Sequence, residues 1–138
     1  MSILLALLLL AAPGFEQGAA GQVIVNPSEA KWVPEKNPPG AESVTLREDA
    51  ATGVVEYIVR YPAGHKFSAH WHNVNERIFM IEGKLAIGQE PNVKIIEPGG
   101  YAFLPKREVQ YMSCVSTTRC TFYLSWDGKT DFNKPPVK

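Results

Sequence analysis

Short apolar runs separated by turn residues occupy most of this chain, and they constrain its fold more than any other feature. In residues 54–61, Val55, Tyr57 and Val59 alternate with Glu56 and Arg60, which is the period of a half-buried strand. No window after residue 20 has a helical period, and Gly- or Pro-containing turns separate the runs. Many short strands at regular spacing predict an all-β sandwich or barrel. We predict strands at 44–48, 54–61, 67–72, 76–81, 85–87, 93–96, 101–104, 109–115 and 119–126.

The length of 138 residues fits one domain. We expect residues 44–126 to form the barrel. Residues 21–43 contain four prolines, which disfavour a helix and indicate an extended N-terminal arm. Residues 127–138 form a polar C-terminal tail that we expect to pack loosely.

The first 20 residues differ from the rest. An apolar run from Ile3 to Ala12 is too short for a bilayer, which needs roughly 20 apolar residues. Small residues follow at Gly18, Ala19 and Ala20, an order typical of a secretory signal peptide. A buried helix or a membrane anchor is the alternative. We expect cleavage after residue 20 and a secreted protein, periplasmic or extracellular, without a membrane contact after processing.

Charge gives no reason to expect a nucleic-acid partner. Lys and Arg number 14 and Asp and Glu number 14, so no net positive field favours nucleic acid. The two cysteines, Cys114 and Cys120, flank a short turn. In an oxidising compartment an even pair favours a disulfide, and two buried free thiols are the alternative.

A candidate metal site lies between residues 70 and 76. On a strand, residues i and i+2 point to the same face, so His70 and His72 can meet one ion. Glu76 begins the next apolar run and can bring a carboxylate to the same point. Two histidines and a carboxylate form a known ligand set for a redox metal with open positions. A pair of surface histidines is the alternative.

These residues carry a resemblance to a known family. The spacing Gly64-x5-His70-x-His72-x3-Glu76-x6-Gly83 resembles the first motif of the cupin superfamily. Residues 98–105, Pro-Gly-Gly followed by an apolar strand and Pro105, resemble the second. The resemblance implies a single-domain cupin, a jelly-roll or double-stranded β-helix barrel with one metal ion in its mouth. It also implies a homodimer.

Gln110 departs from the family pattern. It stands where cupins usually have the last His ligand. The site has either lost its metal and become a binding pocket, or it uses Gln110 as a weak ligand or outer hydrogen-bond partner. By alternation Gln110, Met112 and Cys114 share one face, which weakens the case for a disulfide on the surface.

Two further side chains are candidates for roles at this site. Tyr111, next to Gln110, is a candidate catalytic residue that moves a proton or carries a radical. His65 is either a solvated loop residue or a fourth ligand or substrate contact. Glu76 is a candidate both as a ligand and as a catalytic group that positions an oxygen species.

The identity of the metal follows from its ligands and from secretion. Two imidazoles with oxygen donors suit copper, which persists outside the cell, and manganese or iron come next. The chain also resembles the small secreted mono-copper cupins that oxidatively cleave cellulose, through its leader, its His70-x-His72 pair and Gln110. That resemblance implies an oxidoreductase that uses O2 or peroxide and an external electron donor on an extracellular carbohydrate or other small organic substrate. A non-redox metal-dependent lyase or isomerase is one alternative, and a sugar- or small-ligand-binding module without turnover is another.

Overall fold

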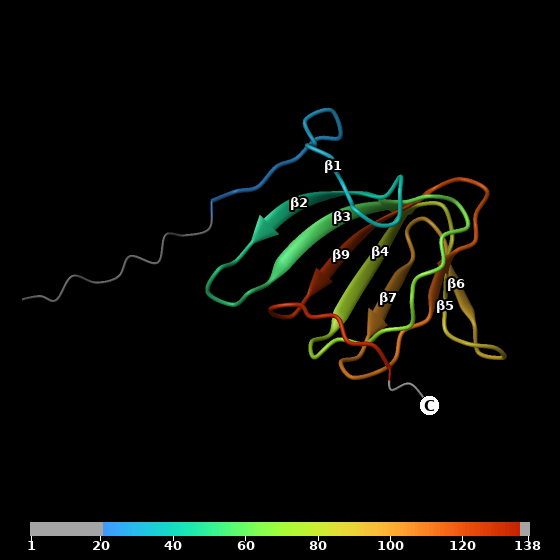
Figure 1. The fold of residues 1–138 in the computed structure, drawn as a ribbon. Coiled ribbons are helices and arrows are strands. Elements are labelled where there is room, and N and C mark those ends of the chain that lie inside the picture. Colours follow the sequence, from blue (N-terminus) through green and yellow to red (C-terminus); the bar gives the residue numbers. More distant parts are fainter. Residues whose placement is uncertain (1–20, 136–138) are drawn as a thin grey trace, which may run out of the picture.

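A computed structural model describes residues 21–135 of the chain. All named strands in this part pair antiparallel, in two sheets (Figure 1). The larger sheet has six strands in the order β1-β2-β3-β9-β4-β7, and the smaller has three in the order β6-β5-β8. Their bounds are β1 Val33–Pro34, β2 Glu42–Glu48, β3 Val55–Tyr61, β4 Glu76–Glu82, β5 Leu85–Ile87, β6 Lys94–Ile96, β7 Tyr101–Leu104, β8 Met112–Cys114 and β9 Cys120–Trp126.

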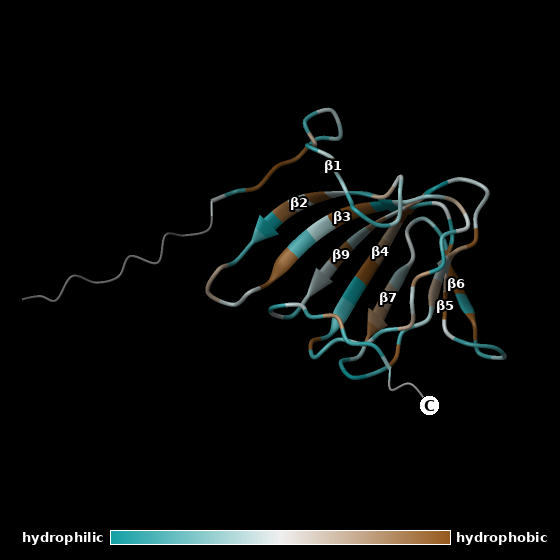
Figure 2. Ribbon diagram, viewed as in Figure 1, coloured by the Kyte–Doolittle hydropathy of each residue, from teal (hydrophilic) through white to brown (hydrophobic). Residues whose placement is uncertain are grey.

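The core lies between the two sheets. One face of β3, β4 and β9 packs against β5 and β8. In β4, buried side chains alternate with more exposed ones, because successive side chains of a strand point to opposite faces. Figure 2 shows hydrophobic residues on the strands and mostly hydrophilic loops between them. The all-β prediction is therefore confirmed. The buried core consists of Val59, Ile78, Met80, Leu85, Met112, Cys114, Cys120 and Phe122.

Two predicted strands are wrong in extent. Residues 67–72 form no regular strand: they contain only isolated bridges, from His70 to Gln110 and from Trp71 to Asn133. Consecutive residues thus pair with two different segments, which prevents a continuous ladder. Residues 109–115 reduce to β8, Met112–Cys114, with Gln110 as a bridge of its own.

The expectation that the C-terminal tail packs loosely is also wrong for its described part. Trp71 and Asn133 exchange both backbone hydrogen bonds, with N···O distances of 2.9 and 3.0 Å. The chain beyond β9 therefore returns to the segment that carries the two histidines.

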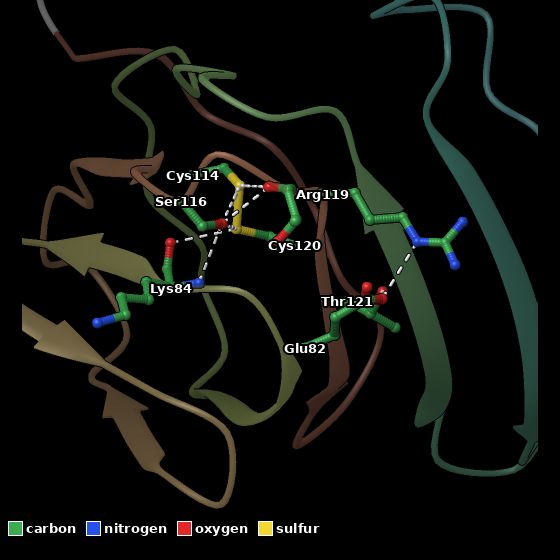
Figure 3. Close-up of a disulfide and its surroundings, with 8 residues drawn as sticks. Glu82, Lys84, Cys114, Ser116, Arg119, Cys120 and Thr121 are labelled. Carbon is green, nitrogen blue, oxygen red and sulfur yellow. Dashed lines mark hydrogen bonds and ion pairs between the residues drawn. A yellow bond between two sulfur atoms is a disulfide. The ribbon is translucent and has the colours of Figure 1, made fainter.

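The sulfur atoms of Cys114 and Cys120 are joined in a disulfide (Figure 3). Both cysteines are buried, and Gln110 and Met112 are buried with Cys114, which confirms that these three share an inner face. The disulfide joins β8 of the smaller sheet to the start of β9 in the larger one.

Replacing both cysteines by Ala is expected to lower the free energy of unfolding by about 2 kcal/mol, because a closed loop this short restricts the unfolded chain only modestly. Urea unfolding of the double variant and of the wild-type protein, both without reductant, measures the difference. Equal midpoints would show that the disulfide contributes nothing.

Gly83 illustrates why the sequence motif ends on glycine. Its φ is +80°, and a Cβ atom here would lie 2.5 Å from the carbonyl oxygen of Arg119. Gly99 has a similar φ of +87° but nothing within 4 Å of a Cβ.

Gly83→Ala and Gly99→Ala therefore form a matched pair. Both lose about 1–2 kcal/mol from the left-handed backbone. Only Gly83→Ala adds a backbone clash, so its unfolding midpoint in urea is expected to fall further. Equal losses would show that the chain around Arg119 moves aside without cost.

Candidate metal centre

Both histidines of the site come from the irregular segment before β4. The backbone of His70 pairs with Gln110, with N···O distances of 3.4 and 2.7 Å. The carbonyl of His72 accepts a hydrogen bond from the backbone N–H of Arg107 at 2.8 Å. Glu76 is the first residue of β4. The side chains of His70, His72 and Glu76 are all buried, with exposed fractions of 5%, 4% and 2%.

These three side chains converge. Each offers one ligand atom, and the three atoms lie within 4.8 Å of one another. The Nε2 atom of His72 is 3.1 Å from Oε2 of Glu76. Bonds from N and O donors to metals such as zinc are about 2.0–2.2 Å long, so small side-chain rotations let all three reach one ion. The structure therefore brings together the three residues that the sequence pattern singled out.

The outer nitrogen of each imidazole is anchored by a backbone carbonyl. Nδ1 of His70 donates to the carbonyl oxygen of Ser68 at 2.7 Å, and Nδ1 of His72 donates to that of Asp131. A carbonyl only accepts, so the proton sits on Nδ1 and the lone pair of the neutral ring is on Nε2. Metal-binding histidines are typically held in this way.

The electrostatics at this point favour a positive charge. Burial lowers the pKa of His70, which keeps its imidazole neutral. Burial also opposes protonation of His72, but the Glu76 carboxylate and the Asp131 carbonyl outweigh it and raise the pKa of His72. The buried Glu76 side chain thus favours a positive charge beside it, on His72 or on a bound cation.

Several buried polar atoms lack partners. Within residues 21–135, neither Oε2 of Glu76 nor either amide atom of Gln110 has a hydrogen-bond partner. The contact between Nε2 of His72 and Oε2 of Glu76 is an ion pair only when His72 is protonated. Unpaired buried polar groups are costly, and a carboxylate is the costliest among them. A metal ion at this point would satisfy Glu76, so the residues present fit such an ion.

Gln110 lies on the same side as His70, because residues directly opposite in an antiparallel bridge project to one face. It is 4% exposed. Its amide can therefore ligate an ion or bond to one of its other ligands.

The structure does not bring Tyr111 to this site. Tyr111 is half-buried between buried Gln110 and Met112, and it lines a different pocket with Gly88 and Val93.

A pocket of about 260 Å³ opens beside His70. The ring of His65 forms part of its wall, stacked on Tyr61 at 5.1 Å and edge-on to Phe67 at 4.6 Å. Burial lowers the pKa of His65. His65 is thus a wall residue of the pocket. The residues that line this pocket come from the arm, from β3, from residues 65–70 and from the tail. They are Asn37, Pro38, Tyr61, His65, Lys66, Phe67, Ser68, His70 and Phe132.

Sequence reasoning missed the contribution of residues 131–133. Asp131 reaches His72 across 59 residues of sequence, through a backbone carbonyl that any residue possesses. Phe132 stacks on His70 with ring centroids 4.5 Å apart. No periodicity or motif in the tail signals either contact.

Two antiparallel sheets around one core, with two histidines and a glutamate buried at one end, define a cupin that can hold a metal ion. The chain belongs to the ChrR cupin-like domain family, whose model matches residues 20–126. No match was found among curated proteins.

Solved structures support the fold. A polyketide cyclase from Streptomyces resistomycificus is 15% identical, with a TM-score of 0.70 over 86% of this chain and 88% of its own. An acetylacetone dioxygenase from Acinetobacter johnsonii is 19% identical, with a TM-score of 0.71 over 89% and 84%. A putative acetylacetone dioxygenase from Methylibium petroleiphilum is 21% identical, with a TM-score of 0.70 over 88% and 90%. At these identities the likeness shows the fold alone.

Proposed function

We propose that this protein is a metal-dependent enzyme that acts on a small organic molecule bound in the pocket beside His70. The observation that carries the proposal is the buried donor set: His70 and His72 anchored at Nδ1, and Oε2 of Glu76 without a hydrogen-bond partner among the described residues. When bound, the ion would supply Lewis-acid polarisation of a substrate carbonyl or carboxylate.

The pocket favours a planar, anionic substrate. Its volume of about 260 Å³ suits a small molecule rather than a polymer segment. Aromatic rings from Tyr61, Phe67 and Phe132 form its walls, and the exposed Lys66 lies at its edge. None of the described residues that line it is acidic. A carboxylate on the substrate would therefore lie close to the positive charge of Lys66.

Two wall residues can handle protons. His65, with a pKa lowered by burial, is neutral at pH 7 and can accept a proton from the substrate. Tyr61 is held protonated, because burial and the charges of Glu35 and Glu76 raise its pKa. Its hydroxyl is therefore available as a donor. This arrangement suits proton removal next to a carbonyl, as in a lyase or isomerase.

Pyruvate is a suitable probe, because it carries a carboxylate and a carbonyl with adjacent C–H bonds. His65 would take a methyl proton, the C–H electron pair would move toward the carbonyl oxygen, and a deuteron would return from D2O. Loss of the methyl ¹H signal is followed by NMR without oxygen, with protein loaded with Mn²⁺ or Zn²⁺. We expect the wild-type protein to exchange the methyl protons of pyruvate faster than the free metal ion does.

Two variants complete this test. His65→Phe keeps the stacking on Tyr61 and removes the proton acceptor, so it should slow exchange while metal content is unchanged. His70→Ala should abolish both metal loading and exchange. Exchange no faster than with the free ion would contradict the proposal.

A second candidate is O2-dependent chemistry, because two histidines and one carboxylate with open positions also form the ligand set of non-haem iron oxygenases. The narrower hypothesis of a copper enzyme that oxidatively cleaves cellulose belongs here. It depends on the histidine pair and Gln110, and none of the comparisons supports it. Oxygen uptake by the iron- or copper-loaded protein, with ascorbate as electron donor and cellulose or acetylacetone present, distinguishes this candidate.

Residues 1–20, the predicted signal peptide, lie outside the described residues, and secretion stays a prediction. No helix in residues 21–135 is long and apolar enough to cross a membrane. The homodimer, the carbohydrate substrate and the absence of nucleic-acid partners also remain predictions.

A further inference from the structure

After β9 the chain returns to residues 70–73, which include the two histidines. We call residues 130–133 the strap. The strap is fixed by its own backbone, since Asn133 and Trp71 exchange two hydrogen bonds. The side-chain amide of Asn133 also donates to the carbonyl of Trp71, at 3.4 Å. Trp71 lies between the two histidines in sequence, so the strap is paired with the residue that separates the ligands.

The carboxylate of Asp131 locks the strap in place. It accepts hydrogen bonds from the backbone N–H of Asn73 at 2.8 Å and from its side-chain amide. It also accepts one from the side-chain amide of Asn133 at 2.8 Å. The backbone N–H of Asn73 is the main cause that lowers the pKa of Asp131, which is ionised at neutral pH. These bonds hold the Asp131 carbonyl against Nδ1 of His72.

The neighbouring strap residue covers the other histidine. The ring of Phe132 lies parallel to that of His70, at an interplanar angle of 15°. One side of Phe132 packs on this imidazole, yet 57% of the residue is exposed. Phe132 also lines the pocket beside His70. It therefore shields one face of a ligand and narrows the approach to it.

We infer that the strap is a working part of the metal centre, in which Asp131 positions His72 for the ion and Phe132 controls access to His70. The metal-affinity part of this inference rests on the proposed metal-dependent function. Asp131 acts through His72 and is a positioning residue. Phe132 is a determinant of access.

The first test compares Asp131→Ala with Asp49→Ala. Asp49 is also a loop carboxylate that accepts backbone hydrogen bonds, from Ala51 and Thr52, but its contacts do not involve the histidines. Titration with Co²⁺, followed by its visible absorption, gives the dissociation constant. Asp131→Ala keeps the backbone carbonyl but removes the side-chain hydrogen bonds that hold it against His72. We therefore expect this variant alone to bind Co²⁺ more weakly, by up to the about 10–100-fold typical of a lost outer partner. Asp131→Asn retains an acceptor oxygen and should recover part of the loss.

The second test needs no metal. In ¹H–¹⁵N spectra of the metal-free protein, the Nδ1–H proton of His72 should be protected from solvent in wild type and in Asp49→Ala. It should exchange rapidly in Asp131→Ala. If wild type bound no Co²⁺, the proposed function would fail while this signal still tested the strap. An unchanged signal with intact folding by circular dichroism would overturn the positioning role.

The third test concerns Phe132. In Phe132→Ala, removal of Co²⁺ by EDTA should be faster, and in Phe103→Ala it should match wild type. Phe103 is also an exposed aromatic residue, 45% exposed, but on β7. Equal release rates in the two variants would overturn the access role.

Discussion

We expect His72→Ala to abolish stoichiometric metal binding, because it would remove one of the three proposed ligands, which the fold already orients. His72 is 4% exposed, anchored at Nδ1 and 3.1 Å from the Glu76 carboxylate through Nε2. Alanine also leaves the buried Glu76 side chain without the imidazole beside it. The affinity should fall by more than the about 10–100-fold typical of outer-partner loss. Elemental mass spectrometry after dialysis against one equivalent of Zn²⁺ or Mn²⁺ measures the change.

The third histidine of the chain supplies the control. His65 lines the pocket but is not part of the cluster of His70, His72 and Glu76. His65→Ala is therefore expected to retain one equivalent of metal. Retention of metal by His72→Ala, or its loss in His65→Ala, would place the ion elsewhere.

Phe122→Ala is expected to lower the free energy of unfolding by about 3–5 kcal/mol, the usual cost of truncating a buried Phe. Phe122 is 1% exposed and central to the core. Its ring lies 6.0 Å from that of Tyr61 and 6.4 Å from that of Phe67. The same cavity would therefore loosen two walls of the pocket beside His70.

Phe103→Ala is the control for this loss. Phe103 is on β7, 45% exposed, and should cost less than about 1 kcal/mol. Equilibrium unfolding in urea measures both variants. Similar losses in the two would show that the packing between the sheets is not what stabilises the fold.

Much of the fold could be predicted because strands leave a local signal. The alternation of Val55, Tyr57 and Val59 identifies β3 without knowledge of its partners. The histidine pair could be predicted for the same reason, although residues 67–72 are irregular. The i, i+2 spacing and the position of Glu76 at the start of a strand were enough.

The parts of the fold and of the site that could not be predicted depend on contacts between distant segments of the chain. His70 pairs with Gln110 and Trp71 with Asn133, and no local pattern indicates that consecutive residues change partners. The strap acts partly through a backbone carbonyl, which has no sequence signature. The disulfide was left open because inward-facing cysteines argued against one on the surface. The structure shows a buried disulfide instead.

The most direct test is a crystal structure of the metal-loaded protein, with anomalous data collected on both sides of the metal absorption edge. We expect one anomalous peak per chain, within about 2.0–2.2 Å of Nε2 of His70, Nε2 of His72 and a carboxylate oxygen of Glu76. A peak elsewhere, or no peak with Glu76 hydrogen-bonded to protonated His72, would contradict the metal centre.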